Sequence, residues 1–197
     1  MTTESLSEEQ VSSEEPRTDL LERPTTWLGH VIAWWGILGI LMLLGQALYR
    51  LSPLAIEPVA NGMMNGFHWA CYIGWSLANA YMEGYRGFQL AFSPMVVRRA
   101  FALGRNPTPL RAILAPFYCM ALFAAPRARI IVSWFIIVAV VILILLIRQL
   151  SQPWRGIVDI GVVIGLGWGA LSIVVFFAFA VLGKPVPRER RRKRRQS

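Results

Sequence analysis

The fold is decided first by residues 130–147, which read IIVSWFIIVAVVILILLI without one charged side chain. At about 1.5 Å per residue this run makes a helix close to the roughly 30 Å of hydrocarbon that a membrane helix crosses. A helix that is apolar all round is either buried in a large protein or surrounded by lipid. We therefore expect a transmembrane helix here and interpret the rest of the chain around it.

Three other stretches resemble it, within a chain of 197 residues that is 55% hydrophobic. Two are long and apolar, and the later one carries Asp159 near its start. A third is uncharged but visibly more polar. The sequence thus predicts an all-α membrane protein of four transmembrane helices, at about residues 27–49, 59–81, 130–147 and 157–182.

The charges predict an orientation. Residues 1–26 carry seven acidic side chains against Arg17 and Arg23, whereas residues 83–129 carry seven Arg against Glu83, and residues 184–197 are strongly basic. Basic residues near span ends stay on the cytoplasmic side. Four spans place the central segment and the C-terminal tail on one side, so we expect both termini in the cytoplasm of a multi-pass protein of the inner (cytoplasmic) membrane.

This arrangement divides the chain into three parts. Residues 1–26 are expected to form a disordered acidic cytoplasmic tail, since they contain few apolar side chains to bury. They lack the basic start of a signal peptide. Residues 27–183 form the membrane domain. Residues 184–197 form a basic cytoplasmic tail, for which anionic lipid is the expected partner and nucleic acid the less favoured one.

The central segment, residues 88–125, predicts an amphipathic layer on the cytoplasmic side between the second and third spans. In its first part, Phe88, Phe92, Val96 and Phe101 predict an apolar face, with Arg98 and Arg99 reaching toward headgroups. Residues 110–125 are too short for a fifth span, and Pro109 and Pro116 interrupt a helix there. They are expected to be interfacial or re-entrant.

The outer connections carry turn signals. Ser52-Pro53 predicts the end of the first helix. Pro153 predicts the start of the last helix, in which Asp159 can pair with Arg155 at i, i+4.

A line of polar residues runs along the second span at spacings of three and four, which places them on one helix face. Two interpretations stay open. The residues form hydrogen bonds that fix helix packing, or they line a polar path or ligand site. The face comprises Asn61, Asn65, His68, Tyr72, Ser76, Asn79, Glu83 and Arg86.

At the expected cytoplasmic end of this face, Glu83 and Arg86 lie at i, i+3 and predict a structural ion pair. In the last span Gly161, Gly165 and Gly169 are spaced by four, a pattern that lets another backbone approach closely. This approach would serve either packing within the chain or a contact with another chain.

The sequence offers little for chemistry. His30 and His68, the two histidines, lie at different predicted depths and do not suit a shared haem, and no cofactor is expected. Cys71 and Cys119 lie in apolar surroundings and predict buried thiols. We find no metal-binding or catalytic motif, so an enzyme is disfavoured.

The leading hypothesis is therefore a non-enzymatic accessory or assembly protein that acts through helix packing and an Arg-rich cytoplasmic face. It predicts a membrane-protein partner or a homo-oligomer. The alternative is a small transporter or channel that uses the polar face of the second span.

Overall fold

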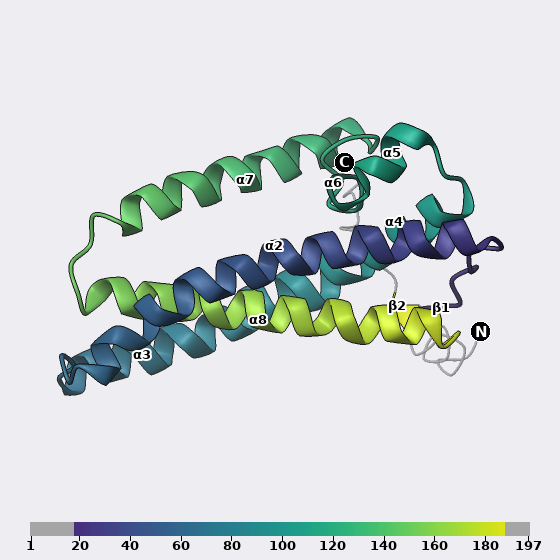
Figure 1. Cartoon of the computed structure of the whole chain (residues 1–197). Coiled ribbons are helices and arrows are strands. Elements are labelled where there is room, and N and C mark those ends of the chain that lie inside the picture. The colour runs from purple at the N-terminus through teal and green to yellow at the C-terminus, as the bar shows by residue number, and fades with distance from the viewer. Residues whose placement is uncertain (1–17, 188–197) are drawn as a thin grey trace, which may run out of the picture.

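A computed structural model describes residues 18–187 and is nearly all helical. Long helices lie alongside one another in a bundle, and one further long helix lies beside it (Figure 1). The described chain begins at Thr18 and ends at Pro187, and these two termini lie at the same end of the bundle (Figure 1). The elements in chain order are β1 (Thr18–Asp19), α2 (Trp27–Ala60), α3 (Gly66–Asn79), η1 (Ala80–Phe92), α4 (Ser93–Arg105), α5 (Pro109–Ile113), α6 (Ala115–Cys119), α7 (Arg127–Ile147), α8 (Trp154–Val181) and β2 (Val186–Pro187).

Three of these helices, α2, α7 and α8, are long and apolar enough to cross a membrane. This is compatible with a multi-pass membrane protein. Residues 110–125 contain only the five-residue helices α5 and α6 and a following turn, which agrees with their being too short for a span.

Helix α2 is longer than the sequence predicts. The side chain of Thr26 caps its first turn by accepting from the Gly29 amide at 3.2 Å. The expected break at Ser52-Pro53 does not occur, because the helix continues through Pro53 and Pro58 to Ala60. The Ser52 hydroxyl donates to the Leu48 carbonyl at 2.7 Å, a local bond that is common where proline interrupts a membrane helix.

The second long rod is one continuous helix made of α3, η1 and α4. It begins at Gly66 instead of near residue 59, because residues 59–60 still belong to α2. Its 13-residue middle part, η1, is a π-helix, in which each backbone hydrogen bond joins residues five positions apart instead of the four of an α-helix. No sequence signal predicts this change of winding.

The bundle core lies toward the end that holds both termini. Ile37 and Ile40 of α2, Val96 of α4, and Ile173 and Phe177 of α8 are almost fully buried there. At this end α2 and α4 come so close that a Cβ on Gly29 would collide with the backbone carbonyl of Gly104. Val96 and Phe101, which belong to the apolar face that the sequence predicts, are buried in this core.

Helix α7 is different, since most of its side chains are exposed. Figure 1 shows it apart from α2 and α8 along most of its length. Near its start the Ser133 hydroxyl donates to the Met120 carbonyl, and the Trp134 indole donates to the Leu122 carbonyl, both at 3.3 Å. These bonds anchor one end of a helix whose apolar surface suits lipid on all sides.

The two short strands connect the tails. β1 and β2 pair antiparallel, with Thr18 opposite Pro187 and Asp19 opposite Val186. Part of the tail that the sequence predicts to be disordered, residues 18–26, thus has defined structure. Residues 1–17 of that prediction, and residues 188–197 of the basic tail, lie outside the described residues.

The contact between α2 and α4 makes a first prediction. Gly29→Ala should place a methyl group against the Gly104 carbonyl and lower stability by about 1–3 kcal/mol, the usual cost of overpacking. The measurement is the thermal midpoint of the detergent-purified protein. Gly45→Ala in the same helix is the matched control, because nothing lies within 4 Å of its added Cβ. Equal midpoints for both variants would contradict the close crossing.

Candidate functional site

The candidate site is the polar face predicted on the second span, and its first residues form the turn between α2 and α3. Asn61 lies at the C-terminal cap of α2. The Asn65 side chain caps α3 by accepting from the His68 amide at 2.9 Å, and the Asn65 amide points to His68 Nδ1 at 3.4 Å. These three residues therefore build helix ends and do not belong to one face inside a span.

The next residues contact the other helices. The Tyr72 hydroxyl donates to the Ala55 carbonyl of α2 at 3.4 Å. Asn79 is buried, and its amide donates to the Trp75 carbonyl one turn earlier at 2.9 Å. Within residues 18–187 the buried hydroxyl of Ser76 has no hydrogen-bond partner.

The polar face packs against the glycines of α8. A Cβ on Gly161 would meet Trp75 and Asn79, one on Gly165 would meet Glu83, and one on Gly169 would meet Phe88. Because each glycine lacks a side chain, the larger side chains of α3 and η1 lie directly against the α8 backbone. The structure thus joins two features that the sequence shows separately, the polar face and the glycine line.

Helices α8 and α3–η1–α4 run in the same direction, since successive contacts advance along both chains. The Trp75 indole donates to the Val158 carbonyl at 3.4 Å, the Trp168 indole to Gln89 Oε1 at 2.8 Å, and the hydroxyls of Ser93 and Ser172 are 2.7 Å apart. The sequence does not reveal this register, because the partners lie about 80 positions apart.

The π-helical winding of η1 keeps the two helices in register. From Gly161 to Ser172, α8 advances 11 residues, while the facing stretch from Asn79 to Ser93 advances 14. Two α-helices of these lengths would differ by about 4.5 Å at 1.5 Å per residue. The wider winding fits the three extra residues into the same length and keeps Glu83 and Phe88 on the α8 side.

One expectation for the end of the polar face needs correction. Glu83 faces Gly165, ten residues or about 15 Å along α8 from Arg155, so it lies beside the middle of α8. Among the described residues, no ion pair joins Glu83 to Arg86. The reason is the winding of η1, which separates residues three apart more widely around the axis than an α-helix does. Both side chains are exposed.

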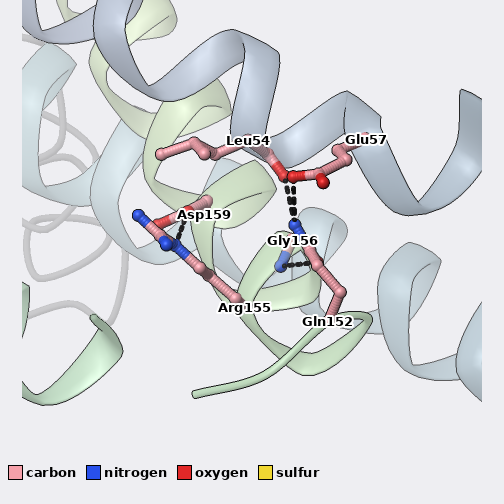
Figure 2. Close-up of polar contacts among 6 residues, drawn as sticks. All are labelled: Leu54, Glu57, Gln152, Arg155, Gly156 and Asp159. Carbon is pink, nitrogen blue, oxygen red and sulfur yellow. Dashed lines mark hydrogen bonds and ion pairs between the residues drawn. The ribbon is translucent and has the colours of Figure 1, made fainter. Parts of the chain in front are cut away.

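At the opposite end from the termini, a polar cluster holds α8 to α2 (Figure 2). The Gln152 amide donates to Glu57 Oε2 at 2.8 Å and to the Leu54 carbonyl at 3.3 Å, and its own oxygen accepts from the Gly156 amide at 3.1 Å. Sequence reasoning missed this cluster, because Gln152 and Glu57 are 95 positions apart.

The predicted pair of Arg155 and the buried Asp159 is present beside this cluster, with 3.7 Å between Nε and Oδ2. The start of α8 at Trp154, directly after Pro153, also agrees with the prediction.

The arginines of the central segment are used differently from the prediction. Instead of reaching to headgroups, Arg98 donates to the Val186 carbonyl at 3.0 Å, and Arg99 donates to the Tyr118 carbonyl at 2.7 Å. The Arg99 guanidinium also lies 4.1 Å from the centre of the Tyr118 ring. Partial burial lowers the pKa of Arg99 from its usual value. These side chains tie α4 to β2 and α6.

The two thiols differ. Cys119 is fully buried, and desolvation raises its pKa to about 12. Cys71 is only half-buried, in contrast to the prediction, and lies in a groove between α3 and α8. Within residues 18–187, no group of three or more His, Cys, Asp or Glu side chains is placed to hold a metal ion.

No protein-family model, curated protein or solved structure matches this chain. The function is therefore argued from its own residues.

The glycine contact makes a second prediction. Gly165→Leu should collide with Glu83, separate α8 from η1 and lower the thermal midpoint in detergent, because close approach of backbones stabilises membrane helix pairs. Gly167→Leu is the matched control on the same helix, since its added Cβ would meet open space. A midpoint that falls equally in both variants, or in neither, would show that the glycine face makes no special contact.

Proposed function

We propose that the chain is a four-span protein of the cytoplasmic membrane and acts as a non-enzymatic accessory or assembly protein. In this proposal α2, α7 and α8 are three spans, and α3 with η1 is the fourth. Helices α4, α5 and α6 form the amphipathic layer at the end that holds both termini. The excess of Arg at that end supports a cytoplasmic location for it.

The choice between a role in helix packing and a role in transport rests on the hydrogen bonds of the polar face. Tyr72 bonds to α2, Asn79 bonds within its own helix, and Asn65 caps a helix. Gln89 and Ser93, farther along the same rod, contact α8. Bonds of this kind between membrane helices contribute about 1 kcal/mol or less and select one arrangement of the bundle. A transport path needs such groups to face water, so their use in contacts favours a role based on helix packing.

The cytoplasmic face supplies the second part of the proposal. Arg111 and Arg127 are exposed at the end of the bundle that holds the termini. They suit acidic groups of a partner protein. Lys184 begins the basic tail, most of which lies outside the described residues. That tail suits anionic lipid, at about 1 kcal/mol for each basic residue near the surface.

One observation favours the alternative of a small transporter or channel. Glu83 faces Gly165 well inside the length of α8, and ionisable groups at such a depth often mark ion or substrate paths. Flux separates the two proposals. A transporter moves a solute or ion in proteoliposomes that contain this protein alone, whereas an accessory protein does not.

The topology makes a third prediction. Reporter fusions after Arg105 and at the C-terminus should both report the cytoplasm, and a fusion after Ser151 should report the external side. The reason is that Arg105 and the C-terminus each follow an even number of proposed crossings, whereas Ser151 follows an odd number. An external signal at Arg105 would exclude α3–η1 as a span.

The accessory role makes a fourth prediction. The full chain, purified from its native membrane in mild detergent, should retain a stoichiometric membrane-protein partner. Arg111→Gln with Arg127→Gln should lower that retention several-fold, because exposed charges at an interface set partner choice. The matched control is Arg148→Gln, at the opposite end of α7. A protein without a stable partner that supports solute flux alone would overturn the proposal.

A further inference from the structure

The outward side of α3 carries a line of small residues. Gly66, Ala70, Gly74 and Ala78 are spaced by four and are all exposed. A Cβ on Gly66 or Gly74 would meet nothing within 4 Å, unlike those on the glycines of α8. Small residues in this spacing let a second helix approach closely in a membrane. The line does not by itself identify that helix.

On η1, beyond this line, Arg86 and Glu83 identify the partner by charge; Glu83 is exposed although it also lies against Gly165 of α8. They are exposed and opposite in sign, and within residues 18–187 neither forms an ion pair or hydrogen bond. Glu83 faces Gly165, and Arg86 precedes Phe88, which faces Gly169. Both therefore lie about 15–20 Å along α8 from Arg155, which in the proposed four-span arrangement is near the middle of a bilayer about 30 Å thick.

Charges at this depth are costly unless they are paired. A partner that pairs with both Glu83 and Arg86 must offer one basic and one acidic group at almost the same depth in the membrane. A second copy of this chain meets that requirement, because a two-fold contact brings residue i to residue j and residue j to residue i. Two copies inserted in the same orientation can be related by a two-fold axis along the membrane normal, which leaves depths unchanged.

We propose that two copies of this chain pack through α3 and η1 across such an axis, with Glu83 of each copy paired to Arg86 of the other. The exchange satisfies four charges with two ion pairs. Gly87, exposed beside them, leaves room for the approach. The pairing rests on the proposed placement of α3 and η1 as a span, and it does not depend on the accessory role.

An apolar groove continues the same surface toward the other end of α3. Cys71, Gly74 and Ala78 lie at i, i+3 and i+7 and so share one helix face. Tryptophan side chains of α3 and α8 form its walls. The groove holds about 400 Å³ and is lined by Cys71, Gly74, Trp75, Trp154, Ile157 and Val158. The Cys71 side chains of two copies would then face each other close to the axis.

This geometry allows a test with native residues. Mild oxidation of membranes that contain the full chain should give a disulfide-linked dimer. Cys71→Ala should lower its yield at least tenfold. Cys119→Ala should leave the yield unchanged, because Cys119 is buried and remains a protonated thiol.

Charge exchange tests the ion pairs. Glu83→Arg alone and Arg86→Glu alone should each lower the cross-linked fraction several-fold, since each brings like charges together. The double variant should restore most of it. Glu83→Gln and Arg86→Gln, which keep the side-chain size, should lower it less, and thermal midpoints show which variants fold.

Three results would overturn the proposal. The first is a monomer in detergent together with no Cys71 cross-link in membranes. The second is a cross-linked fraction that stays constant in the folded Glu83→Arg variant. The third is a different protein that binds one to one through Glu83 while the Cys71 cross-link is absent, which would assign this face to a hetero-partner.

Discussion

The structure depends on the close approach of the α8 backbone to α3 and η1. Lipid is as apolar as the helix surfaces, so burial of apolar area gives membrane helices little reason to associate, and tight contact becomes the main attraction. Gly161, Gly165 and Gly169 provide that contact by leaving space for side chains of the facing helix. The parallel direction of the two helices and the π-helical winding of η1 follow from keeping these contacts aligned. Helix α2 then packs on α8 from another side, with Gly156 against Pro58.

The sequence predicts features that depend on composition or on near neighbours in the chain. The apolar lengths of α2, α7 and α8, the start of α8 after Pro153 and the pair of Arg155 with Asp159 are of this kind. The continuation of α2 through Pro53 was not predicted, because a proline ends a helix in water more readily than within a packed membrane bundle. The winding of η1 and the contact of Glu83 with Gly165 also escaped prediction, since both involve residues about 80 positions away.

The arginines show why counting charges predicts orientation better than it predicts contacts. Arg98 and Arg99 belong to the basic excess that indicates a cytoplasmic end, yet both donate to backbone carbonyls inside the protein. Carbonyls at helix ends and turns lack partners from the helix itself, and a guanidinium with several donors can satisfy more than one of them. Arg99 does so for Tyr118 and Phe123. The same side chains therefore belong both to the charge pattern that predicts the orientation and to the contacts that stabilise the fold.

The polar face separates into two groups once its partners are known. Asn65, Tyr72 and Asn79 have partners inside the chain, so their presence in an apolar segment is explained by the fold. The side chains of Ser76, Glu83 and Arg86 have none among the described residues, and a charge inside a bilayer costs more than an amide or a hydroxyl. The two charged residues are thus the most costly ones that the fold leaves unexplained. In the proposed span the single chain does not offset this cost, which favours another protein surface over lipid at the middle of η1.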